Sequence, residues 1–576
     1  MALAPAPNAA TITVRQALNL LDGPFAGLAG GIAQCRYAFW LGSGISRERV
    51  DDLKGVIAKV LAHLQSNIVA GDPTCAYRTA LTEAIQLAHL SPGDFGQIDF
   101  TVPAANWPVI DTALTNLTRE YSRLLDIRVN GHPEPDYLLW DVVDVPTTFA
   151  AGVVEPDCEH LCLAIMALEG VLPDVVTANW DGLIEAAVNE LTDSADVALR
   201  VCVIPDDFRE PPLLSRLLKF HGCAVRAAAD PATYRPLLIA RYSQITDWPH
   251  NADYTLMRRQ LVDLAATKPT LMVGLSAQDV NIQFLFGEAR ALMQWTWPSD
   301  PPAHVFAEDS LGQDQRNILR VVYRDAYDGN IPAIEAAALF RAYAKPALTA
   351  LVLHVLCTKL RTYLQQVDAP LLTQPDRAAL ERGIVTLRDR LSAGAEPDRL
   401  EFVRSVVRGT SQAMALFQQG AAAADFRYRA LGTASVQRIS ADVNLATAGV
   451  RELAAALAVL GVGDAAGHWS VSPSDPAIPN TGALRLTAGP ATTRIFFAAN
   501  DRAGVQLEIN GLVRPDDGDA IVIHSTSPVA KMARSPVAPP GRTGRAGLRN
   551  IGMGELLREA RSADHLGMRF REEAAL

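Results

Sequence analysis

Short apolar runs that end in small or polar residues and then continue into helical periodicity recur along the first half of the chain. The run AFWL ends in GSGIS, after which RERVDDLKGVIAKVLAHL places apolar residues on one face of a helix. In the same way DVV leads through TANWD into LIEAAVNEL, and TLMV leads through GLSAQD into VNIQFLF. Each unit predicts a buried strand, a turn and a helix. The alternation predicts an α/β fold with a doubly wound parallel sheet.

Two parts of the chain depart from this alternation. Residues from about 65 to 165 contain helical segments with aromatic, proline-rich joints such as PAANWPVID, which predicts a helical insertion over the crevice at the sheet edge. After residue 300 the strand signal fades, and runs such as LTALVLHVLCTKLRTYLQQV favour helices. From about residue 466 the β-branched runs TTRIFFAAND and DAIVIHSTS predict strands. We therefore expect an α/β domain at 1–300, a helical region at 301–465 and a small β-rich domain at 466–576.

Length and charge narrow the class of protein. A chain of 576 residues exceeds the size of one hydrophobic core, so two to four domains are expected. A net charge of -11 argues against a chain-wide electrostatic grip on nucleic acid, so any such contact is regional or indirect. The N-terminus lacks the basic flank and apolar run of a secretion signal, and no apolar stretch reaches the length that spans a bilayer. We expect a cytoplasmic protein without a membrane contact.

The cysteines do not form a metal or disulfide pattern. All 7 are scattered, and no two form a CxxC pair. Cys158 and Cys162 flank His160 in CEHLC, but this spacing is that of one helix face, and a metal site would need a further ligand. We read them as reduced core thiols and expect no metal.

Candidate chemistry lies in the predicted turns. Gly42 and Gly44 would let backbone amides approach a phosphate group, and Ser46 is placed to cap the next helix, whose positive end would face the anion. Alone, such a turn is as often structural. Asn179 and Asp181 follow the next buried strand, where ligands bind in open α/β sheets, although Asn and Asp also organise turns and cap helices. His221 comes before a glycine, just past the apolar run LLKF.

Taken in order, GSGIS, TANWD, HG and GLSAQD resemble the motifs of the sirtuin superfamily, specifically of the sirtuin-like domains of bacterial antiphage defence proteins. The first is similar to the family's GAGxS phosphate loop, with Ser43 in place of alanine, and the second to its T-x-N-[IYF]-D motif. The resemblance covers roughly residues 30 to 300 and implies a Rossmann-like fold. It implies NAD contacts for Gly42, Ser43, Gly44, Ser46, Gly274, Ser276 and Asp279.

The resemblance also implies a reaction. Asn179 would position a water molecule or the ribose hydroxyls, His221 would accept a proton from them, and Asp181 would orient either side chain. The two CxxC zinc pairs of protein deacylase sirtuins are absent, which favours a hydrolase that spends NAD without an acyl acceptor. NAD would be the substrate, and the products would be nicotinamide with linear or cyclic ADP-ribose.

In such defence proteins the activity is held in check by a sensor domain or a partner. We therefore expect that the C-terminal half forms a homo-oligomer or binds a second defence protein, such as a short Argonaute or a helicase. Two alternatives remain: a true NAD-dependent protein deacylase, and a sensor that binds NAD or ADP-ribose without consuming it. The basic, acid-free stretch from Ser527 to Asn550 is either a solvated loop or a strip that docks an acidic partner surface.

Overall fold

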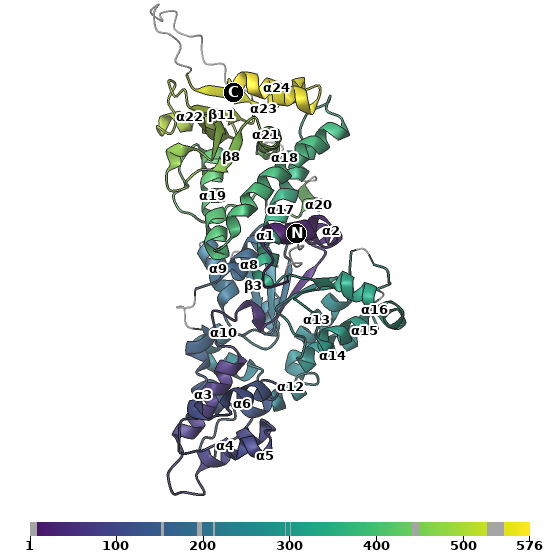
Figure 1. The fold of residues 1–576 in the computed structure, drawn as a ribbon, viewed down its shortest axis with the longest axis vertical. Coiled ribbons are helices and arrows are strands. Elements are labelled where there is room, and N and C mark those ends of the chain that lie inside the picture. The colour runs from purple at the N-terminus through teal and green to yellow at the C-terminus, as the bar shows by residue number, and fades with distance from the viewer. Residues whose placement is uncertain are drawn as a thin grey trace, which may run out of the picture.

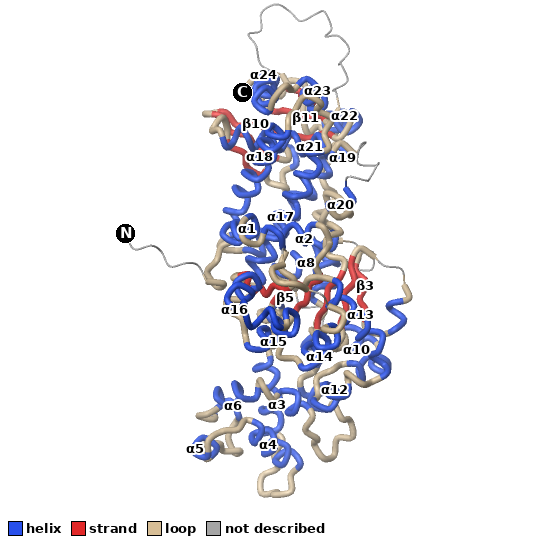
Figure 2. Tube along the Cα trace, turned by 90° about the vertical axis from the view of Figure 1, so that its right-hand side faces the viewer, coloured by secondary structure: helices blue, strands red, loops and turns tan. Residues whose placement is uncertain are grey.

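The computed structural model describes residues 8–150, 155–192, 198–210, 213–293, 295–299, 301–439, 448–526 and 547–576. Three tiers follow one another along the long axis of the molecule (Figures 1 and 2). A lobe of helices lies at one end, an α/β tier in the middle and a second α/β tier at the other end. The middle tier holds the predicted chemistry.

The described residues of the middle tier form a seven-stranded parallel sheet with the order β3-β4-β2-β1-β5-β6-β7. This confirms the predicted doubly wound parallel sheet. Its strands are β1 (Ala38–Leu41), β2 (Asp174–Thr177), β3 (Leu199–Cys202), β4 (Ser215–Lys219), β5 (Thr270–Val273), β6 (His304–Ala307) and β7 (Leu339–Phe340).

Side chains of the central strands alternate between two buried cores. Phe39 and Leu41 of β1 belong to the core on one face, whereas Ala38 and Trp40 belong to the core on the other. A strand covered on both faces reads as a continuous apolar run, which is why four residues suffice to place it inside the protein. The first face is covered by α1 (Val14–Asp22), α2 (Ala26–Ala33), α8 (Cys158–Leu168), α9 (Leu183–Leu191) and α17 (Ala344–Gln365). The second is covered by α12 (Tyr242–Asp247), α13 (Thr255–Thr267), α14 (Val280–Ala289), α15 (Gln313–Tyr323) and α16 (Asp325–Ala338).

Helix α17 is long and apolar enough, by length and composition, to cross a membrane. Of its most apolar window, 72% is buried inside the protein, where the helix packs against α1, α8 and α18. It is therefore the core helix that joins the two α/β tiers.

The helical lobe corresponds to the predicted insertion, but its boundaries differ. It contains α3 (Leu53–Ser66), α4 (Ala76–Leu87), α5 (Pro92–Phe95), α6 (Ile110–Leu117) and α7 (Tyr121–Leu125), which share one core with parts of α10 (Ala224–Ala229) and the segment after α11 (Pro231–Tyr234). Helix α3 was expected to cover the sheet, whereas it packs on α4, α6 and α7. Helix α8, which we placed partly inside the insertion, lies on the sheet instead.

The sheet also extends past residue 300, where a helical region was expected to begin. β6 and β7 add two parallel strands at its edge, and α15 and α16 cover them. HVFA follows two prolines and begins with a polar histidine, and the strand LF has only two residues, so neither forms a recognisable apolar run in the sequence.

The C-terminal tier is built on a mixed sheet whose described strands have the order β12-β11-β10-β9-β8. β10, β11 and β12 are parallel, and β9 pairs antiparallel with both β8 and β10. Its strands are β8 (Ser470–Pro473), β9 (Leu484–Ala488), β10 (Ala491–Ala498), β11 (Ala520–His524) and β12 (Arg549–Gly552). Its helices are α18 (Gln374–Ser392), α19 (Arg399–Gln419), α20 (Val436–Ile439), α21 (Val450–Ala465), α22 (Asp501–Ile509), α23 (Met553–Glu559) and α24 (Ala563–Ala574).

The predicted basic segment falls between the last two strands. Residues 527–546 lie outside the described residues. Arg549 belongs to β12, where its guanidinium donates hydrogen bonds to the carbonyl oxygens of Ala574 and Gly518. The two readings of the stretch, a solvated loop or a strip that docks a partner, stay predictions.

Candidate active site

The predicted motifs gather at the carboxyl edge of the middle sheet. Four neighbouring strands of the sheet are each followed by one of the four motifs. In their order across the sheet these strands are β4, β2, β1 and β5. Since the carboxyl ends of parallel strands meet at one edge, the sheet brings together loops from Gly42 to Asp279. This carboxyl edge is where open α/β sheets bind ligands, and it is called the crevice below.

The loop after β1 touches the loop after β5 through their backbones. The Gly42 and Gly44 amides donate hydrogen bonds to the carbonyls of Val273 (3.1 Å) and Gly274 (3.1 Å). Both amides are therefore used within the protein and are not free to hold a phosphate, as we had expected of them. The side chain of Ser43 is exposed on this loop, which leaves Ser43 as its open contact for a ligand.

Ser46 does not cap the next helix, contrary to expectation. Helix α3 begins at Leu53, and its N-cap is Asp52, whose carboxylate accepts from the Gly55 amide at 2.9 Å. The buried Ser46 hydroxyl lies instead 3.3 Å from Nε2 of His160 and 3.5 Å from Nδ2 of Asn179. The positive end of α3 is thus separated from the loop by residues 47–52.

Asn179 is tied to the loop after β1. Its Nδ2 donates to the Gly42 carbonyl at 3.1 Å, and its backbone amide donates to Oγ1 of Thr177 at 3.0 Å. Oγ1 of Thr177 in turn donates to the Leu41 carbonyl at 3.1 Å. The side chain is therefore held at the edge of the crevice, partly exposed and available to a ligand.

His160 stands behind this group and was not predicted as part of it. It is fully buried on α8, and burial lowers the pKa of its imidazole to about 4, so that it is neutral at physiological pH. Cys158 and Cys162 lie on α8 with His160, and both contact Oγ1 of Thr349 on α17. This agrees with the reading of CEHLC as one face of a helix. Because Ser46 and His160 are 114 positions apart in the sequence, no local sequence pattern predicts their contact.

Asp181 organises the start of α9. Its Oδ1 accepts from the Leu183 amide at 3.2 Å, and its backbone carbonyl accepts from Nζ of Lys219 at 2.5 Å. Among the described residues, the contacts of its carboxylate are with the helix start rather than with Asn179 or His221. Its role in orienting those side chains stays a prediction.

Lys219 links two of the loops from inside the protein. Its ammonium is fully buried, 2.5 Å from a carboxylate oxygen of Glu185. Burial lowers its pKa, but Cys223, Glu185 and Asp181 raise it by more, so the side chain stays charged. The one signal in sequence was a lysine inside the apolar run LLKFHG. Lys219 fixes the TANWD loop next to His221.

His221 is enclosed by the first turn of α14. Its Nδ1 lies 3.5 Å from Oδ2 of Asp279, and its Nε2 lies 3.3 Å from Nδ2 of Asn281. The ring is 3% exposed, and burial lowers its pKa although Asp279 acts in the opposite direction. His221 is therefore a neutral imidazole at physiological pH, as a general base requires. Asn281 was not among the predicted site residues.

The loop after β5 holds the remaining predicted residues. Gly274 has φ +60°, Ser276 is exposed, and Asp279 is the N-cap of α14, where it accepts from the Asn281 amide at 2.8 Å. Gln315 donates to the Leu275 carbonyl at 2.9 Å and so fixes the loop. Ser276 and Gln278 are the exposed side chains of this loop that a ligand can reach.

The helical lobe contacts the same crevice. Tyr121 of α7 packs against both the lobe core and the sheet core, and its pKa is raised by burial and by nearby Asp279. The rings of Phe149 and Trp180 meet edge to face at 5.5 Å. Because Trp180 lies between Asn179 and Asp181, the lobe contacts the TANWD loop directly.

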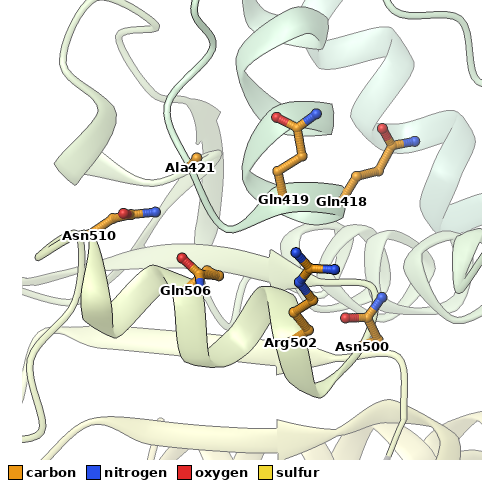
Figure 3. A pocket seen from close by; sticks show the side chains of 7 residues that line it. All are labelled: Gln418, Gln419, Ala421, Asn500, Arg502, Gln506 and Asn510. Carbon is orange, nitrogen blue, oxygen red and sulfur yellow. The ribbon is translucent and has the colours of Figure 1, made fainter.

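A separate groove of about 610 Å³ lies in the C-terminal tier (Figure 3). Polar side chains on the end of α19 and on α22 line it: Gln418, Gln419, Asn500, Arg502, Gln506 and Asn510, together with Ala421. It contains none of the predicted site residues. Because the groove lacks the convergent, buried polar groups of the sheet edge, we place the chemistry at the sheet edge.

Comparison with known proteins agrees with this placement. Residues 173–322 match the family model of the SIR2-like domain. The match contains Asn179, Asp181, His221 and the loop from Gly274 to Asp279, whereas the loop after β1 lies before it. No curated protein matches the chain. The sheet, the order of the loops and the match agree that residues 173–322 are similar to a SIR2-like domain, a family that uses NAD.

Proposed function

We propose that the protein is an NAD glycohydrolase, which cleaves NAD to nicotinamide and ADP-ribose or a cyclic form of it. The observation that carries the proposal is the pair of Asn179 and His221 on neighbouring loops of the SIR2-like domain, one held at the crevice and the other kept neutral by burial. An amide and a neutral imidazole suit a reaction that positions a ribose and removes one proton.

The reaction balances without a further reactant. The bond between C1′ of the ribose and the nicotinamide nitrogen breaks, and its electron pair returns to the nicotinamide ring. A water oxygen bonds to C1′, and its proton passes to His221. Asn179 orients the water or the ribose hydroxyls, and the positive charge that develops on the ribose is stabilised by the fixed dipoles around it.

The size of the C-terminal half supports the proposal that the NAD-consuming activity is regulated. A protein able to consume NAD has to be controlled, and residues beyond the SIR2-like match make up a whole tier of the structure. We propose antiphage defence by NAD depletion, with control by self-assembly or by a second defence protein. A short Argonaute or a helicase would then bring nucleic acid to the complex indirectly.

Two other functions make different products. A protein deacylase would release nicotinamide only with an acetyl-lysine peptide, and would form O-acetyl-ADP-ribose. A sensor would bind NAD and release nothing. The absence of CxxC pairs in the sequence counts against the first, since the deacylases carry a zinc module built on them.

Product analysis separates these functions. The purified full-length chain is incubated with NAD, with and without an acetyl-lysine peptide, alone and after addition of a lysate from phage-infected bacteria. The proposal expects nicotinamide and ADP-ribose in equal amounts without the peptide. NAD that binds but remains intact under all conditions, or nicotinamide release only with the peptide, would contradict it.

A further inference from the structure

One helix turn supplies the neighbours of both ring nitrogens of His221. Asp279, the N-cap of α14, faces Nδ1, and Asn281, two residues on, faces Nε2. The backbone N–H of Asn281 donates a hydrogen bond to Oδ1 of Asp279 at 2.8 Å, which fixes the Asp279 side chain at the start of α14. Both ring nitrogens of His221 thus face side chains from the first turn of α14.

The Asp279 carboxylate and the Asn281 side-chain amide decide which ring nitrogen of His221 carries the proton. A neutral imidazole has one N–H and one acceptor nitrogen. The Asp279 carboxylate only accepts, so it favours a proton on Nδ1, and Nε2 is then an acceptor that suits the Asn281 amide donor. Tyr121, which lies near Asp279, has a raised pKa and is uncharged at physiological pH. Phe220 and Trp248, the rings around His221, carry no charge.

Packing alone does not explain an asparagine at position 281. Its side chain is completely buried, and its Oδ1 has no hydrogen-bond partner among the described residues. A buried, unsatisfied carbonyl costs about 1–3 kcal/mol, whereas a leucine of similar shape would cost nothing of this kind. The amide therefore points to a role beyond packing.

We propose that Asn281 is a positioning residue that keeps the proton of His221 on Nδ1, toward Asp279, and so presents Nε2 as the proton acceptor. This rests on the proposed function for its chemical purpose, since Nε2 is then the atom that takes the proton from water or a ribose hydroxyl. A substrate hydroxyl replaces the Asn281 amide at Nε2, and the ring meets it already in the correct tautomer.

The tautomer can be measured without any turnover. Nitrogen NMR of the full-length protein with labelled histidine distinguishes protonated from unprotonated ring nitrogens, and His221→Gln identifies the resonances of His221. At pH 7.5 we expect Nδ1 protonated and Nε2 unprotonated. In Asn281→Leu, Nε2 should become partly protonated. In Asn281→Asp, a second carboxylate faces the ring, so the pKa of His221 should rise by about one unit or more.

Kinetics supply an independent readout. Asn281→Leu should lower kcat at least about tenfold with a smaller change in KM, because the loss of a tautomer-fixing partner affects the chemical step. Asn281→Asp should move the acid limb of the pH–rate profile to higher pH. A merely structural role would change the unfolding temperature of both variants and leave that limb in place. Asn510→Asp adds the same charge on the exposed C-terminal tier and serves as the control.

The outcomes separate this inference from the proposed function. If the ring nitrogens behave as expected while NAD remains intact, the positioning role stands and the proposed function fails. If NAD is hydrolysed but Nε2 carries the proton in the wild type, or Asn281→Leu and Asn281→Asp leave the His221 resonances unchanged, the positioning role is wrong. A variant that does not fold leaves the other one to decide.

Discussion

Two glycines allow the loops after β1 and β5 to meet at backbone distance. A Cβ atom on Gly42 would collide with the Gly274 carbonyl and lie 2.7 Å from Cα of Leu275. Gly274 itself has φ +60°, a conformation that side chains disfavour. The GSGIS loop after β1 is thus held against the loop after β5 by close contact between their backbones.

Gly42→Ala should therefore destabilise the protein by about 1–3 kcal/mol, the usual cost of forcing an extra carbon into a packed site. Thermal unfolding measures this. Gly30→Ala is the matched control, because Gly30 is in α2 and a Cβ there would meet nothing within 4 Å, so alanine should be neutral or stabilising by up to about 1 kcal/mol. Equal unfolding temperatures for the two variants would show that the loops are not in close contact.

The candidate site residues that directly follow strands could be placed at the sheet edge from the sequence. Asn179 and His221 each come after a short apolar run, and that local pattern is enough to place them at a sheet edge. Asn281 and Lys219 were missed because their roles arise from tertiary contacts, over 60 positions in the case of His221 and Asn281. No period or motif in one sequence encodes such a contact.

At the scale of elements, α18 and α21 pack unusually closely in the C-terminal tier. Gly383 of α18 faces Gly461 of α21, and a Cβ on Gly461 would lie 2.5 Å from the carbonyl carbon of Gly383. Helix backbones approach this closely only where side chains are absent. The pair sets the distance between α17, α18 and α21, which contact one another.

Gly461→Ala should push these helices apart and lower the free energy of unfolding by about 1–3 kcal/mol. Gly409→Ala, in α19, is the control: nothing lies within 4 Å of a Cβ there, and alanine favours the helix by up to about 1 kcal/mol. Chemical denaturation with both variants tests the difference. A Gly461→Ala protein as stable as Gly409→Ala would mean that the helices do not touch at this point.

Helical periodicity predicted α3 correctly as a helix, but not its location. Its apolar face is equally suited to a sheet or to other helices, and the linker of residues 47–52 carries it to the lobe. Similarly, β6 and β7 were overlooked because β6 begins with a polar histidine just after two prolines, and β7 has only two residues. What an element packs on depends on the path of the chain, which local spacing does not contain.

In the molecule as a whole, a buried ionic cluster ties the end of α8 in the middle tier to α17 and to the segment that follows α19. Nζ of Lys359, on α17, lies 2.6 Å from Oε2 of Glu169 at the end of α8, and both side chains are completely buried. Oε1 of Glu169 accepts from the Tyr428 hydroxyl at 2.5 Å. The cluster thus joins the strand that leads to Asn179 with the segment that follows α19.

Lys359→Met should destabilise the protein by about 3–5 kcal/mol, because it leaves the Glu169 carboxylate buried and uncompensated. The double variant Lys359→Met with Glu169→Gln should recover much of this loss, since no isolated charge then remains. Denaturant unfolding of the three proteins gives the comparison. Equal stability of the single and double variants would contradict a buried ion pair.

The sequence predicted an α/β domain at 1–300, a helical region at 301–465 and a β-rich domain at 466–576, with boundaries taken from local signals. In the structure the helices of residues 301–465 belong to the two α/β tiers. The 301 boundary followed two prolines and a loss of apparent strands, whereas the sheet runs on to Phe340 and α17 belongs to both α/β cores. A helix shared by two cores has no distinguishing pattern along the chain. The activating signal and the partner stay predictions at this scale.

If Asn179 and His221 carry out NAD cleavage, as we propose, the rate of nicotinamide release depends on both side chains. The rate is measured at saturating NAD for the wild type, Asn179→Ala, His221→Ala and the control His468→Ala, which alters an exposed histidine of the C-terminal tier. We predict that the two site variants, folded as judged by unfolding temperature, lose about a hundredfold or more, while His468→Ala keeps the wild-type rate. Wild-type rates in both Asn179→Ala and His221→Ala would show that the reaction takes place elsewhere.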